Sequence, residues 1–184
     1  MSDKQIDIEV LDKNMAVQGA GDRLSWHDVR GFTVEGKGWD DTKGFFDRFP
    51  SRAEGVVRDP VWRFSQNSAG ILVRFETDAT EISARWTLMF DRVSMVHMPA
   101  TGVSGLDLYL KDPAIGWRWV GVGKPNKFPE VAANLVSDLE ATFKEYMLYL
   151  PLYNGVKSLE IGVNTNAVVR SSPPRSEEHT SELQ

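Results

Sequence analysis

Short runs in which apolar and polar residues alternate recur along this chain, and they constrain its fold more than any other feature. Residues 71–75 and 82–88 alternate in this way on either side of a turn at 77–80, which predicts a β-hairpin. Similar runs lie at 6–10, 32–34, 61–64, 106–110, 117–120, 146–150 and 159–163. Many short strands separated by turn residues predict an all-β protein built as a sandwich or jelly roll.

One segment has a pattern that also fits a helix. Ser137 and Glu140 have the spacing of a helical capping box. Apolar residues at spacings of three and four surround that pair: Val131, Leu135, Leu139, Phe143, Tyr146 and Leu150. Periodicity alone therefore predicts a helix from about Glu130 to Met147.

Length and charge exclude several classes of protein. A chain of 184 residues is long enough for one domain with a sizeable core. Its net charge of −5 offers no basic surface for nucleic acid, and no cysteine is present to form a disulfide or a thiolate site. No apolar run approaches the roughly 20 residues that span a bilayer. The first ten residues carry Asp3, Asp7 and Glu9 instead of a secretory signal, so the chain as encoded is expected to be cytoplasmic.

The last residues differ in character from the rest. Residues 175–184 have no apolar period and correspond to what a sequencing-library adapter would encode if it were read in frame. We therefore expect a tail that is non-native, with a disordered polar tail as the alternative. The predicted division is a lead-in strand or loop at 1–24, a β-sandwich domain at 25–168 and the tail at 169–184.

Four stretches of sequence carry a resemblance to a known family. They are VWRFS at 61–65 with SAG at 68–70, VRFETDA at 73–79, HMPATGVSGLDLY at 97–109, and EYMLYLPLYNGV at 145–156. Together they resemble the N-terminal domain that precedes the catalytic domain in one group of SGNH (GDSL-type) hydrolases. The resemblance spans about Trp26 to Val163, and it implies a β-sandwich of jelly-roll type followed by an α/β esterase domain. It also favours strands over a helix in residues 131–147.

No catalytic apparatus of an SGNH esterase is recognisable in the chain. Such an enzyme needs a serine nucleophile in a Gly-Asp-Ser turn and a histidine with an aspartate three residues before it. After Gly21-Asp22 the next residue is Arg23, which cannot attack an ester. Leu24 and Ser94 stand three residues before His27 and His97. We therefore predict no catalytic residues, no cofactor and no metal site.

Two groups of residues are candidates for binding a ligand or a neighbouring domain. Trp117 and Trp119 lie two residues apart and so share one face of a strand, where exposed indoles could stack on a sugar ring. A core position is the favoured interpretation for that face, as it is for Trp62 and Trp86, because aromatic residues dominate sandwich cores. The second candidate is the loop of His97, Met98, Pro99 and Thr101, which we expect to contact another domain.

The function predicted from these observations is that of a non-catalytic accessory domain from a truncated SGNH-type esterase. The catalytic domain would be its partner in the same polypeptide, with carbohydrate acetyl esters as one substrate class. An autonomous carbohydrate-binding module is the alternative, and a purely structural domain that stabilises its neighbour is a third interpretation.

Overall fold

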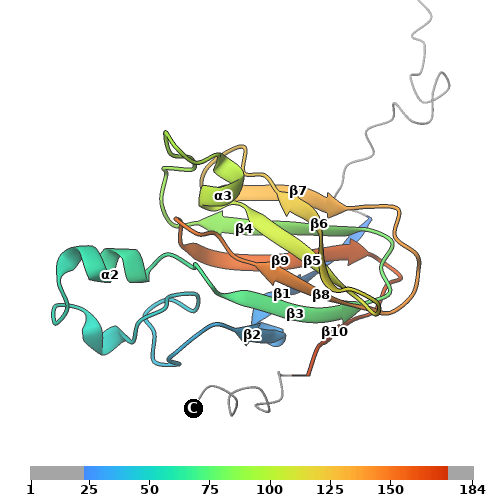
Figure 1. Ribbon diagram of the computed structural model, residues 1–184, viewed down its shortest axis with the longest axis horizontal. Helices are drawn as coiled ribbons and strands as arrows, with labels where there is room; N and C mark the ends of the chain where they lie inside the picture. The colour runs from blue at the N-terminus through green and yellow to red at the C-terminus, as the bar shows by residue number, and fades with distance from the viewer. Residues whose placement is uncertain (1–22, 174–184) are drawn as a thin grey trace, which may run out of the picture.

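Alternating inward and outward side chains build two antiparallel sheets that pack face to face (Figure 1). The computed structural model describes residues 23–173. In the four-stranded sheet the order is β1 (Leu24–Asp28), β9 (Val156–Asn164), β4 (Ile82–Leu88) and β7 (Glu130–Val136). The six-stranded sheet runs β10 (Val169–Ser171), β3 (Leu72–Thr77), β8 (Lys144–Tyr149), β5 (Leu106–Asp112) and β6 (Gly116–Gly123), and β2 (Thr33–Glu35) also pairs with β3. The predicted all-β sandwich is confirmed.

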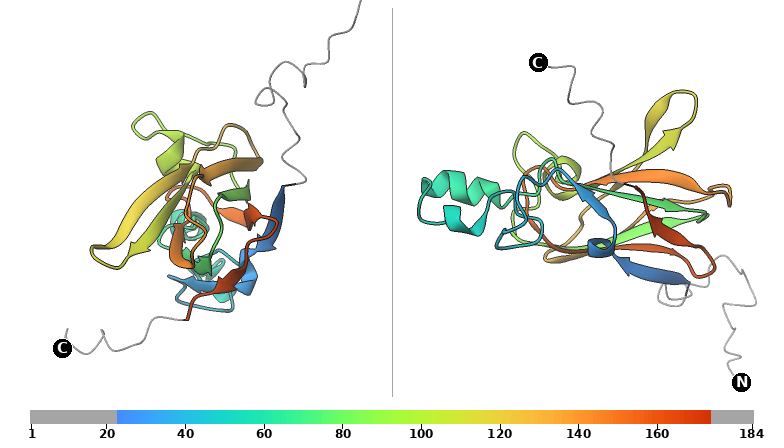
Figure 2. Two further views of the ribbon diagram at one scale, coloured as in Figure 1. Left: turned by 90° about the vertical axis from the view of Figure 1, so that its right-hand side faces the viewer. Right: turned by 90° about the horizontal axis from the view of Figure 1, so that it is seen from below.

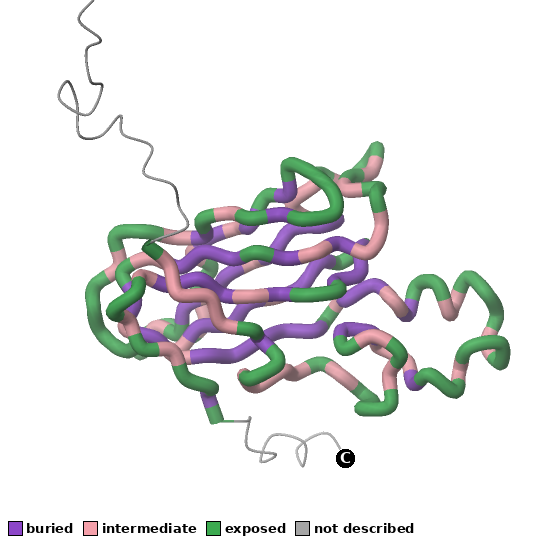
Figure 3. Tube along the Cα trace, turned by 180° about the vertical axis from the view of Figure 1, so that it is seen from behind, coloured by how far each residue is buried: buried purple, intermediate pink, exposed green. Residues whose placement is uncertain are grey.

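The core lies between the two sheets, where buried segments of both face each other (Figure 3). On β4, Trp86 is only 2% exposed, and its indole nitrogen donates a hydrogen bond to the carbonyl of Ser104 at 3.1 Å. On the opposite sheet the rings of Phe75 and Tyr146 stack with centroids 5.5 Å apart. The indole of Trp86 therefore fills the core without leaving its donor unpaired.

Helical segments are short and lie at the margins. They are η1 (Val29–Gly31), η2 (Ser51–Ala53), α2 (Asp59–Ser65) and α3 (Ala100–Ser104). Figures 1 and 2 show α2 beyond one end of the sheets. The strand predicted at 61–64 is wrong, because Pro60 in the first turn and Asp59 before it favour a helix start there. Trp62 is accordingly half-buried on α2 and is not part of the core.

The hairpin predicted at 71–88 is also wrong, although both of its strands exist. β3 pairs with β2, β8 and β10, whereas β4 pairs with β7 and β9, so the turn between them crosses from one sheet to the other. Both strands turn their apolar side chains toward the same core from opposite sides. Alternation reveals which face of a strand is buried, but it does not reveal the neighbouring strand.

Residues 130–149 form strands, as the resemblance implies. β7 ends at Val136, and β8 begins at Lys144 after a turn in which Asp138 takes a positive φ of 59°. A spacing of four residues places two side chains on one face of a strand as well as on one face of a helix. Val131 and Leu135 are thus both buried in β7, which explains the misleading helical pattern.

The ordered sheet extends past residue 168, where the sequence analysis ended the domain. Val169–Ser171 pair with β3 as strand β10, and Ser172 is 1% exposed. The predicted strand at 6–10 and residues 174–184 lie outside the described part of the chain. Between residues 23 and 173, no helix has the length and apolar character that crossing a membrane requires.

Candidate functional site

The outward surface of the six-stranded sheet carries an unusual set of side chains. Cross-strand pairing places Arg74 opposite Met147, Met147 opposite Tyr109, and Tyr109 opposite Trp119. We call this surface the outer face. Its members are every second residue of β3, β5 and β8, together with the two tryptophans of β6 that pair with β5: Leu72, Arg74, Glu76, Asp107, Tyr109, Lys111, Trp117, Trp119, Glu145, Met147 and Tyr149.

A groove of about 490 Å³ runs along the outer face. Its lining includes Thr101 from α3, Tyr109 from β5, Trp117 from β6, Tyr149 from β8 and Leu152 from the following loop. We call it the aromatic groove. Apolar and aromatic side chains with a few polar groups are the lining that binding sites in proteins favour.

Two contacts fix the orientation of the aromatic side chains around the groove. The indole nitrogen of Trp119 donates a hydrogen bond to the Asp107 carboxylate at 3.1 Å, and 52% of Trp119 remains exposed. The rings of Tyr109 and Tyr149 meet edge to face, with centroids 5.7 Å apart. These side chains are held in place before any partner arrives.

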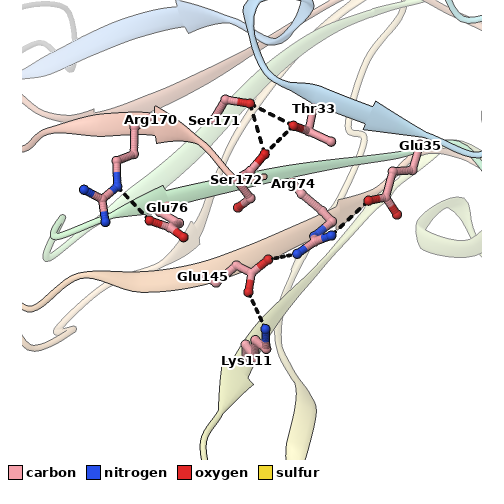
Figure 4. Close-up of polar contacts among 9 residues, drawn as sticks. All are labelled: Thr33, Glu35, Arg74, Glu76, Lys111, Glu145, Arg170, Ser171 and Ser172. Carbon is pink, nitrogen blue, oxygen red and sulfur yellow. Dashed lines mark hydrogen bonds and ion pairs between the residues drawn. The ribbon is translucent and has the colours of Figure 1, made fainter. Parts of the chain in front are cut away.

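An ion-pair network crosses the outer face next to the groove (Figure 4). Arg74 on β3 donates to Glu35 on β2 at 2.9 Å and to Glu145 on β8, and Lys111 on β5 donates to Glu145 at 2.8 Å. Trp117 on β6 lies near both cations, with its ring centroid 6.0 Å from the Arg74 guanidinium and 5.9 Å from the Lys111 ammonium. The network therefore connects side chains from five strands.

Burial and charge act in opposite directions on Glu145. Burial raises the pKa of its carboxyl, but hydrogen bonds from Lys111 and Arg74 outweigh burial and hold that pKa below its ordinary value. Glu145 is thus kept ionised between two cations. One donor of the cluster, Nε of Arg74, is buried and has no hydrogen-bond partner among the described residues.

Strands β2 and β10 complete the edge of this sheet. Arg170 donates to Glu76 at 2.7 Å, and the hydroxyls of Thr33 and Ser171 lie 2.8 Å apart (Figure 4). The described chain therefore leaves the sandwich from the sheet that carries the outer face.

The structure separates the residues that the sequence suggested as contacts. Thr101 and Trp117 line the aromatic groove, and Trp119 borders it through Asp107. The core interpretation of the two tryptophans is wrong, because the bulged pairing of β5 with β6 directs both to the outer face. Trp117 is half-buried there, beside the ion-pair network.

The loop before α3 does not take part in the groove. His97 and Pro99 are exposed and line no part of it, and Met98 packs beside Gly102, where an added Cβ would lie 3.1 Å from the Met98 Cγ. The contact predicted for His97, Met98 and Pro99 therefore stays a prediction that is separate from the groove. The missed residues are Asp107, Tyr109 and Tyr149, and their signal was a polar or aromatic residue at every second position of a buried strand.

Among residues 23–173, no three His, Asp or Glu side chains gather closely enough to hold a metal ion.

Comparison with known families identifies the domain. The family model described as "GxDLY: N-terminus of Esterase_SGNH_hydro-type" matches residues 24–169. The chain belongs to this family. The sequence Gly105-Leu106-Asp107-Leu108-Tyr109 matches the GxDLY motif of the family description. Gly105 directly precedes β5, and the other four residues lie in β5. The resemblance found in the sequence is thereby confirmed, and we refer to the protein below as a GxDLY domain.

Two solved structures are similar to this GxDLY domain. One is of a protein described as a GDSL-like lipase from Bacteroides ovatus ATCC 8483, with 30% identity and a TM-score of 0.76 over 82% of this chain. The other, salicylyl-acyltransferase SsfX3 from a tetracycline biosynthetic pathway, has 16% identity and a TM-score of 0.55 over 83% of this chain, which shows the fold alone. The GxDLY domain spans only 43% and 42% of these two proteins. No curated protein matches the chain significantly.

The structure gives a physical role to each part of the motif. Leu106 and Leu108 are fully buried in the core. Gly105 has no room for a side chain, because a Cβ there would overlap the carbonyl oxygens of Thr101 and Gly123. Asp107 and Tyr109 point the other way and line the aromatic groove. Two of the motif's four named positions therefore serve the outer face and not the core.

Proposed function

We propose that this GxDLY domain is the non-catalytic part of an SGNH-type esterase and that its outer face docks onto the remainder of that esterase. The observation that carries the proposal is the outward direction of Asp107 and Tyr109, the two motif residues that the core does not require. A residue that defines a family and lies outside the core is best explained by a contact with another surface.

The surroundings of the groove support an interface. Tryptophan, tyrosine and arginine are the residues that contribute most to protein–protein binding, and the outer face presents Trp117, Trp119, Tyr109 and Tyr149 with Arg74 beneath.

The occupant that we assign is the rest of the same polypeptide. More than half of each similar structure lies outside the part that matches this domain. The family description places the domain at the N-terminus of the esterase, so the rest follows it. Because the described chain leaves from β10, the next segment starts at the edge of the sheet that bears the outer face. Ester hydrolysis by a Ser–His–Asp triad, on carbohydrate acetyl esters among other substrates, would reside in that following part.

Thiol labelling tests the docking face directly, since the chain contains no cysteine. Leu152→Cys places a thiol in the groove, and Ser158→Cys places one on the outward surface of the opposite sheet. Maleimide labelling of each position is measured by peptide mass spectrometry, in this chain alone and in a longer polypeptide in which an SGNH catalytic domain follows the GxDLY domain. We expect the longer polypeptide to slow labelling at residue 152 at least about tenfold, as a thiol buried at an interface requires, and to leave residue 158 unchanged. If labelling is slower at residue 158 and unchanged at residue 152, the outer face is not the docking surface.

Activity is tested separately on the same two proteins. This chain alone is expected to hydrolyse p-nitrophenyl acetate no faster than buffer, and the longer polypeptide is expected to show saturable turnover. Saturable turnover by this chain would contradict a non-catalytic role.

Sugar binding is a second candidate function, favoured by the half-exposed indole of Trp119 that Asp107 holds in place. A fixed, exposed indole can stack on the apolar face of a sugar ring. Tryptophan fluorescence titrated with xylan-type oligosaccharides tests it. A saturable change that Trp119→Ala abolishes supports this candidate, and a flat response removes it.

A further inference from the structure

A second hollow lies at the end of the sandwich where α2 is found, apart from the aromatic groove. It has a volume of about 370 Å³ and is walled by three segments: α2, the loop after β4, and the loop between β8 and β9. Its principal side chains are Arg63, Phe64, Phe90, Arg92 and Tyr153. We call it the arginine pocket.

The loop walls of this pocket are held by a fully buried asparagine. Asn154 accepts a hydrogen bond from the backbone N–H of Phe90 at 3.0 Å and donates one to the Phe90 carbonyl at 2.9 Å. Its side chain also donates to the Ser104 hydroxyl at 3.0 Å, and its own carbonyl accepts from Ser68 at 3.0 Å. The loop after β4 and the loop after β8 are thus fixed to each other, to the turn between α2 and β3, and to the end of α3.

The α2 wall is held in a similar way. Arg48 donates to the carbonyl of Phe64 at 2.7 Å and to that of Asn67 at 2.9 Å, which satisfies acceptors at the end of the helix. A pocket whose walls are hydrogen-bonded in this way loses little entropy when it binds a ligand.

The two arginines of the pocket differ from the arginines of the domain that form ion pairs. Arg30, Arg52, Arg74, Arg85 and Arg170 each pair with an acidic side chain. Within residues 23–173, neither Arg63 nor Arg92 does so. The adjacent Asp91 and the Asp59 that precedes Arg63 by one helical turn make no ion pair with them. Two uncompensated guanidinium groups in one pocket favour an anion, and their planar donors match the oxygens of a carboxylate or a phosphate.

Aromatic rings supply the rest of the lining. Phe64 is 49% exposed and Tyr153 is 41% exposed, and the guanidinium of Arg63 lies 5.5 Å from the centroid of the Phe64 ring. Exposed rings beside a cation suit a flat, apolar group that carries the negative charge.

We propose that the arginine pocket binds a small molecule in which a carboxylate or phosphate is attached to a planar apolar group. The anion lies between Arg63 and Arg92, and the apolar group contacts Phe64, Phe90 and Tyr153. The pocket adjoins the aromatic groove, since Leu152 lines the groove and the next residue lines the pocket. Binding here does not depend on docking, because this domain alone supplies every residue involved.

Nuclear magnetic resonance on the whole 184-residue chain tests the proposal with defined probes. Phenyl phosphate is expected to shift the backbone amides of Phe90, Arg92 and Tyr153 saturably, with a dissociation constant on the order of 1 mM. Neutral benzyl alcohol lacks the charge and inorganic phosphate lacks the ring, so both are expected to bind at least about tenfold more weakly. Equal binding of either control probe, or no saturation with phenyl phosphate, would overturn the proposal.

Substitutions separate the pocket from general surface charge. Arg63→Gln and Arg92→Gln are each expected to weaken phenyl phosphate binding about tenfold. Arg118→Gln is the matched control. Arg118 on β6 is exposed and forms no ion pair among the described residues, and it lines neither the arginine pocket nor the aromatic groove. Thermal unfolding of all three variants shows whether the fold is kept. An equal loss of affinity in the Arg118 variant would reject the pocket as the site.

Discussion

Gly105 lies where α3 ends and β5 begins, at a point where two backbone segments leave no space for a side chain. A Cβ would overlap the carbonyl of Thr101 and would lie 2.7 Å from the carbonyl of Gly123. Because backbone atoms cannot rotate away as a side chain can, Gly105→Ala is expected to lower the free energy of unfolding by about 1–3 kcal/mol. Urea denaturation measures the change. Gly31→Ala is the control, since a Cβ there meets nothing within 4 Å, and it should change stability by less than about 0.5 kcal/mol. Equal effects would contradict the steric role of Gly105.

At the same scale, the sequence predicted the buried residues of the motif better than the exposed ones. Leu106 and Leu108 follow from alternation alone, because every second residue of a strand faces the core. Asp107 and Tyr109 occupy the intervening positions, which alternation describes only as outward. Their importance depends on Trp119 and Tyr149, which reach them from neighbouring strands. No local pattern encodes such cross-strand contacts.

Between strands, Arg74 joins both of its neighbours on the outer face. Its side chain is 9% exposed and bridges Glu35 and Glu145 on the two flanking strands. Arg74→Met leaves the partly buried Glu35 without its cation and Glu145 with Lys111 alone, so it is expected to cost about 3 kcal/mol of unfolding free energy. Arg52→Met breaks the Arg52–Asp41 pair, whose side chains are 67% and 51% exposed, and should cost less than about 1 kcal/mol. Chemical denaturation of both variants measures the two losses of unfolding free energy. Similar losses in the two variants would contradict this prediction.

The identity of most elements could be read from the sequence, but their partners could not. The strands predicted at 71–75 and 82–88 are found at 72–77 and 82–88, yet they belong to different sheets. Alternation is a property of one strand, whereas pairing depends on which side of the core the chain reaches after a turn. The segment at 61–64 was misread for another reason: Pro60 fixes a backbone angle that starts a helix and outweighs four alternating residues.

For the molecule as a whole, a single core joins the two sheets, so loss of a peripheral strand should affect the stability of the entire domain. β10 adds three residues to the edge of β3. It also brings Arg170 to Glu76 and the Ser171 hydroxyl to Thr33, and it leads to the buried Ser172. The sequence boundary at 168 assigned these residues to the tail, since Ser171-Ser172-Pro173-Pro174 has the composition of a linker.

Two shortened chains test where the sandwich ends. A chain that stops after Val168 loses β10 and its side-chain contacts, and we expect the free energy of unfolding to fall by about 2 kcal/mol. For a domain of this size that loss corresponds to a melting temperature about 4–8 °C lower in a thermal scan followed by circular dichroism. A chain that stops after Pro173 keeps β10 and removes only the polar segment 174–184, so its melting temperature should equal that of the whole chain. If both shortened chains have the melting temperature of the whole chain, β10 contributes nothing to stability and the sequence boundary at 168 is correct. If both melt lower by the same amount, the stabilising contacts lie beyond Pro173 and the tail is part of the fold.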